Sequence, residues 1–345
     1  MQESSPVNRV GTHIEGSGPP IVLLHSSMSS KHQWHELTER LRDRYRLIAI
    51  DLLGYGESAA PSPHYYDIRH EARLVSSVLE RELRADERFH LIGHSYGGVV
   101  ALQLAAQDPM RRLRSLSVFE PVAFHLLGPG DPDLLELKQV WHAVIARMNA
   151  GDALGGAACF VDYWSGVGAF ERLGETRQLA LAAQVNKVLL EYHALGEGAR
   201  NVAAYGGIDV ATCLISGQWS PEPAQRLISM LANIMPHASC FEVAAGHMAP
   251  ITHPELVNPI FEEFIRAVEA SERPPALRGS GWSRVVAVAT AMVMSVGLLG
   301  LGLTATPPEC PVTLGKSLFS RPCECGTKIN CRHVPARRAF VPRLK

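Results

Sequence analysis

The sequence has no excess of charge of either sign and no apolar run near its start. Its 345 residues include 33 Lys and Arg against 34 Asp and Glu, a formal net charge of −1 at pH 7. A protein that binds nucleic acid through the phosphate backbone needs a basic surface, so we expect no nucleic-acid partner. Residues 1–20 are polar and rich in Gly and Pro, so we expect no secretory signal peptide and a cytoplasmic location.

Cysteine is sparse in the main body of the chain. Cys159, Cys213 and Cys240 are scattered there, and the latter two stand in apolar runs, as buried thiols do in a reducing compartment. The class of small domains held by disulfides is therefore excluded. The last 40 residues hold C-x-C and C-x-H pairs, made by Cys323, Cys325, Cys331 and His333, besides Cys310. These pairs are tighter than the usual spacing of structural zinc ligands, so we expect no bound metal.

Apolar residues make up 46% of the chain, enough to bury a sizeable core. Short apolar runs alternate with helix-prone stretches over residues 1–123 and again over residues 209–270. The runs predict buried strands at Pro20–Ser26, Tyr45–Leu52, Phe89–Ser95, Leu113–Glu120, Val210–Gly217 and Ser239–Ala245. The helix-prone stretches are residues 31–43, 68–84, 97–107, 221–235 and 254–269. This alternation predicts an α/β fold, a mostly parallel sheet with helices on both faces.

Residues 124–208 show no strong strand pattern and are rich in Leu, Ala and Gly. We interpret them as a helical lid inserted into the α/β core. Several aromatic residues lie in this range, among them Trp141, Tyr163 and Trp164. They fit two interpretations equally well, the hydrophobic core of the lid and an apolar pocket for an acyl or aryl group.

The carboxyl-terminal part has a different composition. Residues 271–284 contain Pro and Gly and predict a linker. Val285–Thr306 follows, 22 residues without a charge, which as a helix would be roughly 33 Å long. We interpret it as a candidate membrane-spanning helix, the alternative being a buried or amphiphilic tail, and the flanking basic residues favour a cytoplasmic amino-terminal domain. The tail, residues 307–345, is rich in Cys and Arg, and we expect it to be disordered.

The motif Gly93-His94-Ser95-Tyr96-Gly97 follows a predicted strand and precedes a predicted helix. It fits the pattern G-x-S-x-G, in which a sharp strand-to-helix turn exposes a serine hydroxyl above the sheet. The turn crowds backbone against backbone, which explains the two glycines, and it strains the serine. The pattern alone is weak, but this strand–turn–helix context makes it specific for a nucleophilic serine.

Three further motifs occur in the order in which the α/β-hydrolase superfamily has them, and the sequence resembles that superfamily over residues 8–270. His25 ends the first long strand, where the family commonly has His-Gly, and residues 51–58 match its D-x-x-G-x-G-x-S loop. Gly246-His247-Met248 matches the loop that carries the late histidine. The resemblance implies the α/β-hydrolase fold and serine hydrolase activity, with a structural role for the loop at residues 51–58.

The resemblance also implies which residues act with Ser95. Imidazole accepts and returns a proton near neutral pH, and His247 stands at the family position of the base. Many members carry an aspartate after the strand that follows the lid, but Ser220 occupies that place here. A second placement in the superfamily is the end of the preceding strand, which is Glu120 here. We predict the triad Ser95–Glu120–His247; the alternative is a Ser95–His247 dyad in which Glu120 merely caps the lid entrance.

Two backbone N–H groups are expected to form the oxyanion hole. One belongs to Tyr96, the residue after the nucleophile, and one to the loop after the first long strand. Alignment of His25-Ser26 on the family's His-Gly assigns the second to Ser27, although Ser26 replaces the usual glycine.

This machinery predicts hydrolysis of a carboxylic ester or a related small acyl compound through an acyl-serine, with no cofactor. Dehalogenases and epoxide hydrolases of this fold use aspartate as nucleophile, so Ser95 disfavours their reactions. Carbon–carbon bond hydrolysis by the same triad is one alternative. The other is a non-catalytic ligand-binding protein, suggested by the missing aspartate at Ser220.

Overall fold

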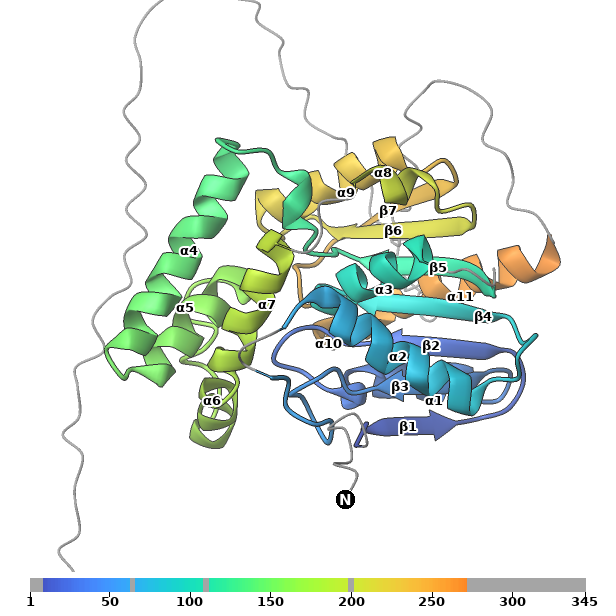
Figure 1. The fold of residues 1–345 in the computed structure, drawn as a ribbon, viewed down its shortest axis with the longest axis horizontal. Helices are drawn as coiled ribbons and strands as arrows, with labels where there is room; N and C mark the ends of the chain where they lie inside the picture. The colour runs from blue at the N-terminus through green and yellow to red at the C-terminus, as the bar shows by residue number, and fades with distance from the viewer. Residues whose placement is uncertain (1–8, 63–65, 108–111, 198–201, 272–345) are drawn as a thin grey trace, which may run out of the picture. The chain divides into compact units, whose positions relative to one another are not determined.

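The computed structural model describes residues 9–62, 66–107, 112–197 and 202–271 (Figure 1). In these ranges seven strands form one sheet in the order β1-β3-β2-β4-β5-β6-β7. Only β1 runs antiparallel to its neighbour, and every other pair is parallel. The strands are β1 Thr12–Glu15, β2 Pro20–Leu24, β3 Arg46–Ile50, β4 Phe89–His94, β5 Leu113–Phe119, β6 Ala211–Gly217 and β7 Ala238–Val243.

The predicted α/β fold with a mostly parallel sheet is confirmed, because each apolar run forms a strand within two residues of its expected ends. The strands β2, β4 and β6 are buried along their whole length, which is why most of their residues are apolar. The edge strand β1 was not predicted from the sequence. Its sequence, THIE, is short and polar, and its side chains are at least partly exposed.

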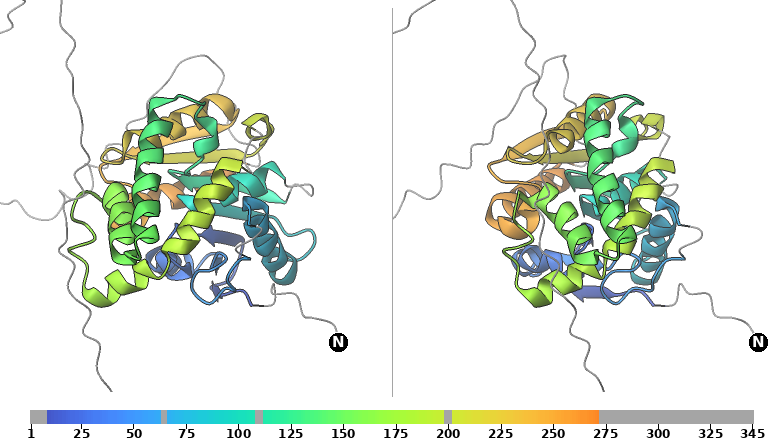
Figure 2. Two further views of the ribbon diagram at one scale, coloured as in Figure 1. Left: turned by 60° about the vertical axis from the view of Figure 1, so that its left-hand side comes forward. Right: turned by 90° about the vertical axis from the view of Figure 1, so that its left-hand side faces the viewer.

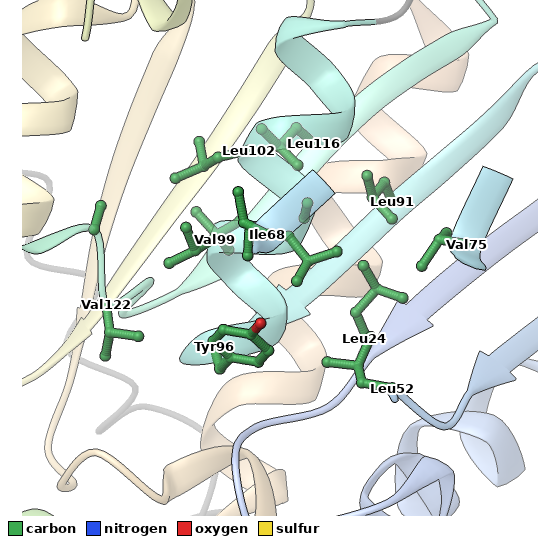
Figure 3. Packing of buried hydrophobic residues seen from close by; sticks show 14 of the residues in the cluster. Leu24, Leu52, Ile68, Val75, Leu91, Tyr96, Val99, Leu102, Leu116 and Val122 are labelled. Atoms are coloured by element: carbon green, nitrogen blue, oxygen red, sulfur yellow. The ribbon is translucent and has the colours of Figure 1, made fainter. Parts of the chain in front are cut away.

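Two hydrophobic clusters hold the helices on opposite faces of the sheet. Val22 and Leu24 of β2 belong to a cluster with residues of α2, α3 and α9, while Ile21 and Leu23 belong to one with residues of α1 and α11. Figure 3 shows part of the first cluster. The helices are α1 His35–Leu41, α2 Ile68–Glu82, α3 Tyr96–Ala106, α9 Glu222–Ile234, α10 Ala249–Thr252 and α11 Pro254–Ala270. The first predicted helix, residues 31–43, begins as the 3-10 helix Lys31–Trp34.

Between β5 and β6 the chain forms a further set of helices, which share a hydrophobic cluster of their own. A 3-10 turn, Phe124–Leu126, comes first. The inserted helices are α4 Pro132–Asn149, α5 Ala153–Ser165, α6 Glu175–Ala182 and α7 Val185–Glu197, and the short α8 Val202–Gly206 leads back to β6. Figures 1 and 2 show α4 to α7 gathered at one side of the sheet.

In the described part of the chain, no helix has both the length and the apolar character needed to cross a membrane. Residues 272–345 lie outside that part. The linker at 271–284, the candidate membrane segment at 285–306 and the cysteine- and arginine-rich tail at 307–345 therefore stay predictions.

Helix α3 packs its backbone directly on β2. A Cβ atom at Gly97 would lie 2.4 Å from the carbonyl oxygen of His25 and 2.5 Å from that of Leu24. Neither oxygen can move without disturbing the sheet, so Gly97→Ala should lower the free energy of unfolding by about 2 kcal/mol. Urea unfolding would measure the loss. The control Gly128→Ala adds a Cβ in open space and should change stability little, and equal stabilities of the two variants would contradict this account of packing.

Candidate active site

Ser95 lies in a strained turn between β4 and α3. Its φ is +54° and its ψ is −116°, a backbone conformation that residues with a side chain rarely adopt. The backbone N–H of Ser95 donates to the carbonyl oxygen of Phe119 at 2.9 Å. A Cβ at Gly93 would lie 2.5 Å from the carbonyl oxygen of Gly97. The turn therefore needs both glycines, as the G-x-S-x-G pattern predicts.

A chain of hydrogen bonds joins Ser95, His247 and Glu120. The Oγ of Ser95 lies 2.9 Å from Nε2 of His247, and Nδ1 of His247 lies 2.7 Å from Oε2 of Glu120. All three side chains are buried, Glu120 completely. A carboxylate beside Nδ1 keeps the ring proton on that nitrogen, which leaves Nε2 free to accept the proton of the serine hydroxyl.

Glu120 comes to this place through the order of the strands. It directly follows β5, which lies between β4 and β6, so its side chain shares the carboxyl edge of the sheet with Ser95. Its N–H donates to the carbonyl oxygen of Ile215 at 3.0 Å, and its Oε1 accepts from the N–H of Gly217 at 2.7 Å. Ser220, at the place where an aspartate was expected, has a buried hydroxyl with no hydrogen-bond partner among the described residues.

Two other histidines near the site are held in the neutral form. Nε2 of His94 donates to the carbonyl oxygen of His247 at 2.8 Å, and burial, followed by the charge of His247, keeps the pKa of His94 well below its usual value. Nδ1 of His25 donates to the carbonyl oxygen of Ser26, and Nε2 accepts from the N–H of Leu52. Burial lowers the pKa of His25 to about 4. Neither ring therefore adds a positive charge beside His247.

Trp164 of α5 lies against the ring of His247. The ring centroids are 4.2 Å apart and the planes are inclined by 32°. The indole of Trp164 therefore covers one face of the imidazole of His247. Trp164 further contacts Phe124 and Phe160. Trp164 thus packs with other residues of the inserted segment and also forms a wall of the site. The sequence had left these two interpretations open, and both hold for this residue.

A pocket opens beside Ser95 under the inserted helices. Its walls are mostly aromatic and aliphatic, and only two serines and one carboxylate interrupt them. The lining residues are Ser27, Ser95, Val122, Phe124, Trp141, Phe160, Trp164, Glu191 and Leu195. Ser27, the predicted oxyanion residue, thus faces the same space as the serine hydroxyl. Tyr96 is the first residue of α3, where a backbone N–H has no partner within the helix.

Asp51, in the loop that the family resemblance marked as structural, is completely buried. It accepts hydrogen bonds from the N–H of Lys31 at 2.7 Å, from Nζ of Lys31 at 2.7 Å and from the N–H of Glu57 at 2.9 Å. The loop contributes no side chain to the pocket lining described above. In the described ranges, no three His, Cys, Asp or Glu side chains are grouped as metal ligands.

The sequence did not reveal Lys187 and Glu191, which are both buried and of which Glu191 lines the pocket. A Lys and a Glu four residues apart on a helix usually form an exposed ion pair. Nothing in the sequence distinguishes that arrangement from a buried one.

A family model described as the alpha/beta hydrolase family matches residues 21–260. A haloalkane dehalogenase from Agrobacterium fabrum is 35% identical over 115 residues, which are 33% of this chain and 36% of the relative. The chain matches only about a third of the length of the first curated relatives.

Solved structures share the fold. An esterase from Thermogutta terrifontis matches with a TM-score of 0.62 at 22% identity, over 75% of this chain and 93% of that one. An enol-lactonase from Burkholderia xenovorans LB400 matches with a TM-score of 0.62 at 20% identity, over 74% of this chain and 96% of that one. The fold predicted from the sequence is confirmed.

Two neutral histidines, the buried His25 and the partly buried His125, should make the protein sensitive to acid. Burial lowers the pKa of His25 and of His125 to about 4, below the value near 6.5 of an unfolded chain. The unfolded chain then binds more protons between about pH 6.5 and pH 4, so the free energy of unfolding should fall as the pH falls through this window. His25 alone should contribute a loss of about 3 kcal/mol, measurable by urea unfolding between about pH 7 and pH 4.

The variant His125→Gln removes one of these groups and provides the control. As the pH falls, the free energy of unfolding of the variant should decrease less steeply than that of the wild type. The two slopes should differ by at most about 1.4 kcal/mol per pH unit. If wild type and variant lost stability in parallel across the window, His125 would not be neutral in the folded protein.

Proposed function

Because the chain belongs to the alpha/beta hydrolase family, we propose that it is a serine hydrolase that cleaves a carboxylic ester or a related acyl compound. The observation that carries this proposal is the hydrogen-bonded chain from Ser95 through His247 to Glu120. A serine hydroxyl is a weak nucleophile until a neighbouring base takes its proton, and His247 has the geometry for this task.

Acylation begins when Ser95 Oγ attacks the carbonyl carbon of the substrate. Nε2 of His247 takes the hydroxyl proton, and the carboxylate of Glu120 stabilises the resulting imidazolium. The carbonyl oxygen becomes an oxyanion, which the N–H groups of Tyr96 and Ser27 stabilise by hydrogen bonds. When the tetrahedral intermediate collapses, the ester bond breaks and His247 gives its proton to the departing alcohol.

Deacylation repeats these roles with water. His247 accepts a proton from water, the hydroxide attacks the acyl-serine, and His247 returns the proton to Ser95 as the carboxylic acid leaves. No step needs a cofactor. The aromatic and aliphatic lining of the pocket favours a small substrate with an apolar acyl or aryl group.

The similarity to a haloalkane dehalogenase raises halide displacement as another reaction. Such enzymes of this fold attack carbon with a carboxylate, and this chain has the hydroxyl of Ser95 at that place. We therefore propose acyl transfer to water in preference to halide displacement.

A fluorescent fluorophosphonate tests for an activated serine without knowledge of the substrate. It should label the wild-type chain at Ser95 and leave Ser95→Ala unlabelled, since only the hydroxyl forms the phosphonate ester. Circular dichroism would show that both proteins are folded. A folded wild-type protein that resists labelling would refute the proposal and favour the ligand-binding alternative, while labelling without ester turnover would favour carbon–carbon bond hydrolysis.

Glu120→Gln tests the acid. The amide of glutamine would donate to Nδ1 of His247 and hold the ring in the wrong tautomer, so kcat on a chromogenic aryl ester should fall by about 10⁴-fold with KM little changed. Steady-state kinetics would measure both constants. A loss within about tenfold would indicate that Ser95 and His247 act as a dyad without Glu120.

A further inference from the structure

A cluster of buried charges lies beside the pocket and has no part in the steps above. Lys187 and Glu191, both on α7, and Glu71 of α2 are all less than a tenth exposed. Nζ of Lys187 lies 2.8 Å from Oε1 of Glu191 and 3.1 Å from Oε1 of Glu71. Buried charges are costly unless they are paired and hydrogen-bonded, so this cluster needs an explanation beyond stability.

One end of the cluster holds the loop after β2. The hydroxyl of Ser27 donates to Oε2 of Glu191 at 2.5 Å. The next residue, Met28, has a φ of +55°, and its side chain packs in the cluster of the inserted helices with Val185 and Val188 of α7. A strained backbone persists only where its surroundings hold it. Helix α7 thus anchors this loop through a hydrogen bond and through packing.

The other end of the cluster reaches the start of α3. Nζ of Lys187 donates to the hydroxyl of Tyr66 at 2.7 Å, and that hydroxyl lies 2.5 Å from the hydroxyl of Tyr96. The same Nζ lies 4.8 Å from the centroid of the Tyr96 ring and 4.6 Å from that of Tyr66. Figure 3 shows Tyr96 at the start of α3. The second predicted oxyanion donor is therefore also connected to α7.

We propose that Lys187 and Glu191 are positioning residues that fix the positions of the two oxyanion donors, Ser27 and Tyr96, relative to each other. The two residues are four apart on α7. The carboxylate of Glu191 faces the side chain of Ser27, and the ammonium of Lys187 faces that of Tyr96. The oxyanion hole is then complete only while α7 is seated on the core, so that catalysis is coupled to the position of the inserted helices. This inference rests on the proposed serine hydrolase function.

The charges suit this role. Burial raises the pKa of Glu191, while Lys187 and the hydroxyl of Ser27 act in the opposite direction. Lys187 thereby helps to keep a negative charge on Glu191, and a hydrogen bond to a charged acceptor is stronger than one to a neutral acceptor.

Four substitutions test the proposal, with two readouts: the second-order rate of fluorophosphonate labelling of Ser95, and kcat and KM on an aryl ester. Ser27→Ala removes the hydroxyl that donates to Glu191, and Tyr66→Phe removes the hydroxyl between Lys187 and Tyr96. Each should lower kcat and the labelling rate by about tenfold with KM unchanged, because a displaced donor stabilises the oxyanion less. Glu191→Ala should do the same. Glu191→Gln should recover a rate within about threefold of wild type, because the Ser27 hydroxyl can donate to or accept from an amide.

The double variant Ser27→Ala with Glu191→Ala should be no slower than the slower single variant, because both remove the same hydrogen bond. The matched control is Glu136→Gln, which weakens the 2.8 Å hydrogen bond from the hydroxyl of Tyr163 to Glu136 within the inserted helices. It should leave both readouts unchanged.

Wild-type rates in Ser27→Ala and Tyr66→Phe, or additive losses in the double variant, would overturn the inference. A rise in KM with unchanged kcat would show a merely structural role and would overturn the inference too. So would a loss of kcat and labelling rate in Glu136→Gln equal to that in the test variants. Ser27→Ala keeps the test valid even if Glu191→Ala does not fold. A folded wild-type protein that resists labelling would refute the proposed function, and with it the inference; labelled wild type with unaffected variants would refute the inference alone.

Discussion

The close backbone approach between α3 and the sheet is the constraint on which the rest of the site depends. Two glycines let the chain turn from β4 into α3 within one residue, and that residue, Ser95, takes up the strain. The turn is held by backbone hydrogen bonds to the neighbouring strand and to the first turn of the helix. Since the strain is local and its supports are buried, the serine hydroxyl has a fixed position before any ligand arrives.

Parallel pairing converts this local turn into a site. The strands β4, β5 and β6 end at the same edge, so residues that are far apart in sequence meet there without long connections. Glu120 uses this register most directly, because its main chain continues the pairing of β5 with β6 and its carboxylate caps the end of β6. The same hydrogen bonds that orient the carboxylate also fix it in the fold.

Much of the core could be predicted because its central strands are buried on both faces and most of their residues are therefore apolar. The polar edge strand β1 could not, since its pairing with β3 compensates for a weak local pattern. At the site, the turn at Ser95 was predictable from two glycines at a fixed spacing. Glu120 was predictable only from its place at a strand end. Lys187 and Glu191 were not, because whether a charged helical face meets water or another buried charge depends on tertiary packing alone.

The inserted segment starts and ends at two neighbouring strands of the sheet, β5 and β6. The insertion begins just after Glu120, at the carboxyl end of β5, and α8 returns the chain to Ala211, the first residue of β6, which pairs with Ser115 near the start of β5. Its ends are therefore fixed in space, whatever the helices between them do. During divergence, the helices of such a segment can be lengthened, shortened or exchanged as a module, and the pocket walls change while Glu120 stays in place. A chimaera that joins foreign helices at these two points would keep the position of Glu120 from the host sheet and would take its ligand preference from the donor.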